Sequence, residues 1–128
     1  MTFSERPGVW RTAFAKTDVE INLGGDASGA SPANTEMAAA CEAQLAGVLS
    51  KALAYISEHI GRAAGVSGQP EIEWIDFGLS NYGEHREFEL YFSDEATYVL
   101  WAVRFQFHSD TETRAASFSP VGFSRRSW

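Results

Sequence analysis

Apolar and polar residues alternate over two segments near the start of the chain, residues 9–14 and 18–23. In the second segment Val19, Ile21 and Leu23 alternate with polar side chains. Successive side chains of a strand point to opposite faces, so this pattern indicates two half-buried strands. Because only a few residues separate them, the two strands are predicted to form an antiparallel hairpin.

The next apolar pattern has the spacing of a helix. Residues 24–32 are rich in Gly and Ser and are predicted to be a linker, since no Gly-Lys-Ser/Thr pattern indicates a phosphate-binding loop. Ser31 and Pro32 then provide an N-cap and a first-turn proline. Apolar residues follow at intervals of three and four, which predicts one amphipathic helix as far as about Ile60, with Gly47 as a bend or a close contact.

Period-two alternation returns in the second half of the chain, in residues 71–77, 86–92, 98–107 and 117–123. The connections between these segments are short, which favours antiparallel neighbours. The chain is therefore expected to be a single α+β domain over residues 1–128. Its predicted form has two layers, with one long helix on a curled antiparallel sheet of about six strands in the order ββαββββ. This architecture resembles that of cystatin-like and NTF2-like proteins.

The same alternation separates the two faces of the later strands. Phe88, Leu90 and Phe92 are predicted to face the helix, as are the odd-numbered residues from Val99 to Phe107. The other face combines acids, tyrosines and an arginine, which is typical of a protein-binding surface. An ordinary solvated face, with an arginine paired to its glutamate neighbours, is the alternative. The expected partner-binding residues are Glu73, Glu87, Glu89, Tyr91, Asp94, Glu95, Tyr98 and Arg104.

Charge supports a basic protein partner. The chain has ten basic and seventeen acidic residues, a net charge of −7, and eight of the acids lie between Glu71 and Glu95 with Arg86 as the single base. Nucleic-acid binding needs clustered basic residues, so no nucleic-acid partner is expected. The first residues lack the apolar run of a signal peptide, and Arg104 interrupts the longest apolar stretch. A cytoplasmic protein without a membrane span is therefore expected. The lone cysteine, Cys41, is predicted to be a small buried apolar group.

Catalytic patterns are sparse, and neither an enzyme activity nor a cofactor is expected. His108, Asp110 and Glu112 would share one side of an extended segment and are a weak alternative metal site. His85, next to Glu84, is interpreted as a solvent-exposed turn residue. Two positions are open for Asp76. It would lie either on the inward face with Ile72 and Trp74, where a buried carboxylate would be a candidate acid or base, or near a strand end in contact with solvent.

The segment FELYFSDEATYVLWAVRF, residues 88–105, pairs two aromatic strands around an acidic turn. It resembles the paired strands of small acidic bacterial toxin-immunity proteins. The resemblance implies a non-catalytic protein that binds a cognate toxin, often a nuclease, and blocks its active site or substrate groove. An acidic surface would complement the basic groove of such an enzyme.

Two other functions remain open from the sequence. A small-ligand binder or enzyme would use a pocket between helix and sheet, lined by Trp74, Tyr98 or Trp101, with Asp76 or a histidine as the polar group. A homodimer would instead pair two copies through the aromatic sheet face. These hypotheses differ in what the sheet and its interior must look like.

Overall fold

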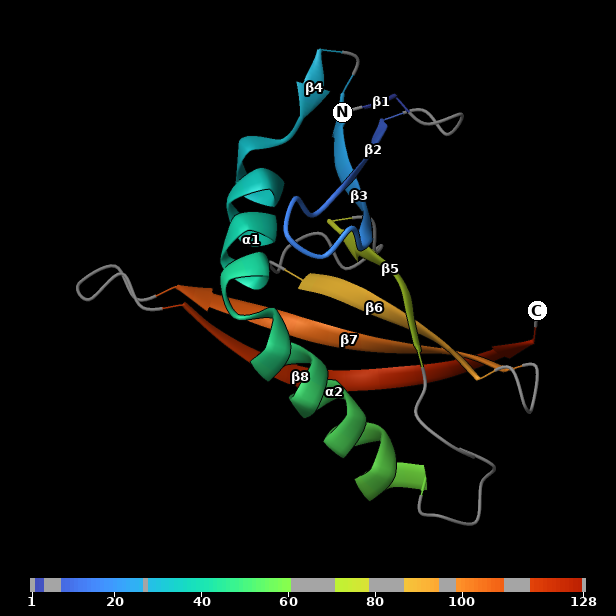
Figure 1. The fold of residues 1–128 in the computed structure, drawn as a ribbon. Helices are drawn as coiled ribbons and strands as arrows, with labels where there is room; N and C mark the ends of the chain where they lie inside the picture. The colour runs from blue at the N-terminus through green and yellow to red at the C-terminus, as the bar shows by residue number, and fades with distance from the viewer. Residues whose placement is uncertain are drawn as a thin grey trace.

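The computed structural model describes residues 2–3, 8–26, 28–60, 71–78, 87–94, 99–109 and 116–127. Two helices and a sheet make up this part of the chain (Figure 1). Their bounds are β1 Thr2–Phe3, β2 Val9–Ala13, β3 Glu20–Asp26, β4 Gly29–Ala30, α1 Pro32–Ala43, α2 Leu45–Ile60, β5 Glu71–Phe77, β6 Glu87–Asp94, β7 Val99–Ser109 and β8 Ala116–Ser127.

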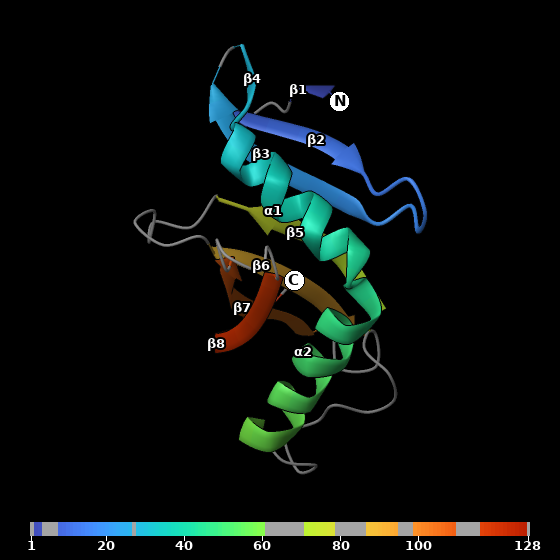
Figure 2. The same cartoon turned by 90° about the vertical axis from the view of Figure 1, so that its left-hand side faces the viewer.

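The sheet is mostly antiparallel and has the order β1-β2-β3-β5-β6-β7-β8, with β4 paired to β3. The exception is the pairing of β3 with β5, which is parallel. Parallel strands need a long crossover, and α1 and α2 provide it on one face of the sheet (Figure 2). The predicted α+β class is confirmed. The order ββαββββ is not, because β1 and β4 are additional short strands.

The helical segment is not one helix but two, which meet at Gln44. The backbone of Gln44 is at φ −120° and ψ 23°, outside helical geometry, and its N–H donates to the carbonyl of Cys41. The bend lets α1 contact β3 and β5 while α2 contacts β8. Buried Cys41, Leu45 and Val48 keep helical spacing across the break, so the apolar pattern gave no sign of it. The possible bend was predicted at Gly47, whereas the break lies three residues earlier, at Gln44.

The core fills the space between the helices and the inner face of the sheet. Phe88 is central: its ring centroid lies 5.3 Å from that of Phe77, 5.3 Å from that of Phe105 and 5.6 Å from that of Phe118. The inward direction predicted for β6 and β7 is confirmed at Phe88, Leu90, Phe92, Trp101, Val103, Phe105 and Phe107, all of which are buried. Packing of this kind stabilises the fold through apolar burial and favourable ring geometry.

A bulge in β5 reverses the predicted faces of its second half. The β5–β6 register shifts between Ile72 and Trp74. One extra residue moves every following side chain to the opposite face. Ile75 and Phe77 are therefore fully buried in the core, whereas Trp74 and Asp76 lie on the outer face. The prediction that Trp74 points inward is wrong, as is the inward alternative for Asp76, while Ile72 still packs against the core.

Strand β8 forms one edge of the sheet. Its register with β7 shifts between the pairs Arg104–Gly122 and Phe105–Pro120, so a second bulge lies here. Proline lacks a backbone N–H and is tolerated at such an edge bulge. The ammonium group of Lys51 on α2 donates to the carbonyl of Phe118 at 3.1 Å, which ties the helix to this strand. Among the described residues, neither helix is long and apolar enough to cross a membrane.

Candidate protein-binding face

The outer sheet face, which is opposite to the helices, carries rows of side chains that run across the strands. Cross-strand partners share a face, so the register defines each row. The central row contains Arg11, Asn22, Asp76, Glu89 and Arg104. The neighbouring row contains Ala13, Glu20, Trp74, Tyr91 and Ala102. We use the name acidic face for Glu20, Glu73, Trp74, Asp76, Glu89 and Tyr91.

An aromatic pair lies at the centre of the acidic face. The rings of Trp74 and Tyr91 stack with centroids 4.6 Å apart and planes inclined by 18°. Tyr91 is buried and Trp74 is half-buried. The hydroxyl of Tyr91 donates to Oε2 of Glu89 at 3.4 Å. The buried Tyr91 thus supports the half-buried indole of Trp74, which provides a contact surface with a carboxylate nearby.

The other carboxylates of the acidic face are also held by neighbours. Oε1 of Glu20 lies 3.0 Å from Nε of Arg11, and both side chains are exposed. Oγ of the buried Ser93 donates to Oε1 of Glu73 at the bulge. These contacts orient the two carboxylates.

Asp76 is held from β3. Its Oδ1 accepts a hydrogen bond of 2.9 Å from Nδ2 of Asn22. Asn22 is 8% exposed, and its amide oxygen is buried with no hydrogen-bond partner in the described part of the chain. The centre of the face therefore contains a buried amide oxygen that no described donor reaches.

Glu87 is buried, unlike the predicted binding residues Glu73 and Glu89. Its Oε2 lies 3.5 Å from Nε of Arg104, and the two side chains are 8% and 31% exposed. A Cβ added at Gly122, which lies opposite Arg104, would be 3.3 Å from the guanidinium. Glu87 and Arg104 thus form an internal ion pair beside Gly122, which has no side chain. The sequence left two interpretations of the outer face open, a protein-binding surface and a solvated face with an arginine paired to its glutamate neighbours. The pair of Glu87 and Arg104 fits the second interpretation.

The structure thus brings together Glu73, Glu89 and Tyr91 of the predicted residues, with Glu87 and Arg104 beside them. Asp94 ends β6, paired with Val99, and its side chain is not described. Glu95 and Tyr98 lie outside the described residues. The sequence did not assign Glu20, Trp74 or Asp76 to this face. Their placement depends on the parallel β3–β5 pairing and on the bulge, neither of which has a local sequence signal.

The residues considered for a metal site or for acid–base chemistry are not brought together among the described residues. His108 is exposed on β7, and Asp110, Glu112, Glu84 and His85 lie outside the described residues. No group of three His, Cys, Asp or Glu side chains within the described segments is placed to hold a metal ion. Cys41 is fully buried, as predicted, and burial raises the pKa of its thiol to about 12.

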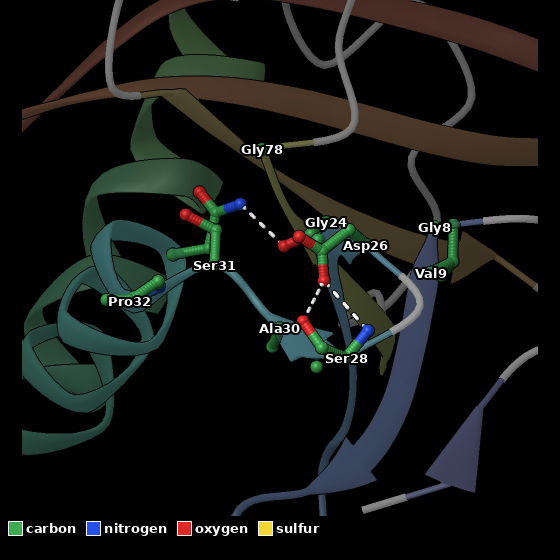
Figure 3. Close-up of a pocket in the computed structure, with 12 residues that line it drawn as sticks. Gly8, Val9, Gly24, Asp26, Ser28, Ala30, Ser31, Pro32 and Gly78 are labelled. Carbon is green, nitrogen blue, oxygen red and sulfur yellow. Dashed lines mark hydrogen bonds between the residues drawn. The ribbon is translucent and has the colours of Figure 1, made fainter.

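A second candidate binding site is an open pocket of about 750 Å³ at the start of α1 (Figure 3). Its lining includes Gly8, Gly24, Gly25, Gly29 and Gly78, together with Asp26 and Ser31. The segment predicted as a linker therefore partly belongs to the sheet, in β3 and β4. The carboxylate of Asp26 accepts hydrogen bonds from the hydroxyl and from the backbone N–H of Ser28, which lower its pKa.

Close packing accounts for glycines of this pocket. Gly78 has φ +70°, and a Cβ there would lie 2.4 Å from the side chain of Asn34. A Cβ at Gly24 would lie 2.8 Å from the carbonyl oxygen of Gly78. The glycines let β3, β5 and α1 approach one another, which is a structural requirement of the fold.

Of the residues predicted to line a pocket between helix and sheet, Trp74 and Trp101 are described and Tyr98 is not. Trp101 is 2% exposed within the core, whereas Trp74 lies on the opposite face of the sheet. Trp74 and Trp101 therefore do not line a common space, and Asp76 lies outside the core with Trp74.

Comparison with protein families, with curated proteins and with solved structures gave no match to this chain.

Proposed function

We propose that this chain is a non-catalytic, immunity-like protein that neutralises a cognate toxin by docking its acidic face on a basic surface of that toxin. The observation that carries the proposal is the stacked pair Trp74–Tyr91 with carboxylates on each side of it. Aromatic side chains supply contact energy at the centre of interfaces, and charges around them steer the encounter and select the partner.

Preorganisation supports the proposal. Glu20, Glu73, Asp76 and Glu89 each have a neighbour that holds the carboxylate in place. Groups that are already ordered lose less side-chain entropy when a partner binds. The face can therefore meet a basic surface with its charges in position.

Charge favours a basic partner over a second copy of the chain. The acidic face bears four carboxylates, and the nearby guanidinium groups of Arg11 and Arg104 are paired with Glu20 and Glu87. Two such faces in contact would bring like charges together, which is unfavourable. A nuclease is the favoured class of toxin, since its substrate groove is basic and the net charge of this chain is −7.

The test is to isolate the partner and measure inhibition. The protein encoded beside this chain, or one captured from extracts of the source cells, would be purified and mixed with it in increasing ratio. We expect a one-to-one complex and loss of the partner's toxic activity at equimolar ratio. A partner that binds but keeps its activity would contradict the neutralising role. A chain that self-associates through this face would contradict the basic partner.

A further inference from the structure

We infer that the acidic face recognises a guanidinium group of its partner, with an arginine side chain lying on the indole of Trp74. This inference rests on the proposed function, because it names the chemical group that the acidic face takes. It concerns the ring surface of Trp74 that Tyr91 does not cover.

The position of Trp74 in its row defines the site. Tyr91 stacks on one side of the indole, from β6. On the other side of β5 lies β3, where Glu20 is the register partner of Trp74. The second ring face of the half-buried indole is therefore directed to the strand that carries a carboxylate.

Carboxylates flank this ring on the same face. Glu73 precedes Trp74 at the bulge, and Asp76 follows two residues later. Asn22 donates a hydrogen bond to Oδ1 of Asp76 and so orients this carboxylate. The site thus combines an aromatic plane with several oxygen acceptors.

Guanidinium fits this combination better than ammonium. It is planar, stacks on aromatic faces and offers five donors that can bind two oxygens at once. Lysine presents a compact, strongly hydrated charge without a plane that could stack. The exposed pair of Arg11 and Glu20 shows that a guanidinium is already accommodated at the border of this site, 3.0 Å from the carboxylate.

The test compares labelled octa-arginine and octa-lysine peptides, which have equal charge, in titrations followed by fluorescence anisotropy at low salt. The wild-type chain should bind octa-arginine at least about threefold more tightly than octa-lysine. Trp74→Leu should reduce this preference to about one, and Trp74→Phe, which keeps an aromatic plane, should retain most of it. On binding to the wild type, arginine side-chain proton signals should shift upfield because of the indole ring current.

Several outcomes would overturn the inference. Equal affinity for the two peptides on the wild type would refute guanidinium selection while leaving the acidic docking surface in place. A preference that persists in folded Trp74→Leu would place the selecting group elsewhere. If the wild type binds neither peptide, the inference and the proposed basic partner both fail. The comparison on the wild type needs no variant, so misfolding of Trp74→Leu would not leave the inference untested.

Discussion

The indole of Trp74 stacks on the phenol ring of Tyr91, with ring centroids 4.6 Å apart, because a bulge in β5 turns Trp74 to the outer face. A regular strand would place Trp74 on the same face as Ile72, which packs against the core. The bulge thus does two things: it brings Ile75 and Phe77 into the core, and it brings Trp74 and Asp76 to the acidic face. Bulges often re-aim side chains next to functional sites.

The ion pair between Glu87 and Arg104 predicts a non-additive effect on stability. Arg104→Gln should lower the free energy of unfolding by about 1–3 kcal/mol, because it leaves a buried carboxylate without its charged partner. Adding Glu87→Gln should restore part of this loss, since no charge then remains buried. Urea denaturation of the two single variants and the double variant measures the coupling. Effects that simply add would show that the pair does not act as a unit.

Two glycines should respond in opposite directions to alanine. Gly78→Ala should destabilise the chain by more than about 1 kcal/mol, because φ is +70° and the new Cβ would meet the amide of Asn34. Gly47→Ala should stabilise it by about 0.5–1 kcal/mol, because Gly47 lies in α2 with nothing within 4 Å of an added Cβ. Thermal unfolding compares the two variants with the wild type. A stable Gly78→Ala protein would mean that the contact between β5 and α1 is looser than described.

Burial of Cys41 predicts a dependence of stability on alkaline pH. Its folded pKa is raised from 9.0 to about 12, mainly by desolvation and further by Glu42. The native state keeps the thiol proton while the unfolded state loses it above pH 9, so this contribution is complete below pH 9 and is lost as pH rises toward 12. The slope is at most about 1.4 kcal/mol per pH unit.

The matched control for this effect is Cys41→Ala, which removes the thiol but keeps a small apolar side chain. Urea denaturation from pH 8 to pH 10.5 measures the unfolding free energy of both proteins. As pH rises, the unfolding free energy of the wild type should fall relative to that of Cys41→Ala. A constant difference would show that the thiol titrates alike in the folded and unfolded states.

The part of the fold that depends on local pattern could be predicted from the sequence. The core face of β6 and β7 followed from alternation alone, since Phe88 and Leu90 are separated from their partners Phe105 and Val103 by one hairpin connection. Burial of Cys41 likewise followed from its place in the helical apolar pattern. In these elements the local period and the tertiary environment agree.

The rest depends on contacts between distant residues. The parallel pairing of Glu20 with Trp74 joins a strand that precedes both helices in the sequence to a strand that follows them. No short-range pattern indicates this pairing. The bulge at Glu73 adds one residue that alternation cannot register. The break at Gln44 falls between apolar residues that keep helical spacing. Half of the acidic face therefore appears only in three dimensions, with Glu20, Trp74 and Asp76.

The most direct test of the central claim, that the acidic face docks on a basic partner, is the affinity of the purified partner for two charge-reversal variants. Glu89→Lys alters the acidic face, and Glu58→Lys makes the same change at an exposed position on α2. We expect Glu89→Lys to weaken binding at least tenfold and to flatten its dependence on salt, and Glu58→Lys to change affinity less than about threefold. Equal effects of the two variants, or no effect of Glu89→Lys, would contradict the claim.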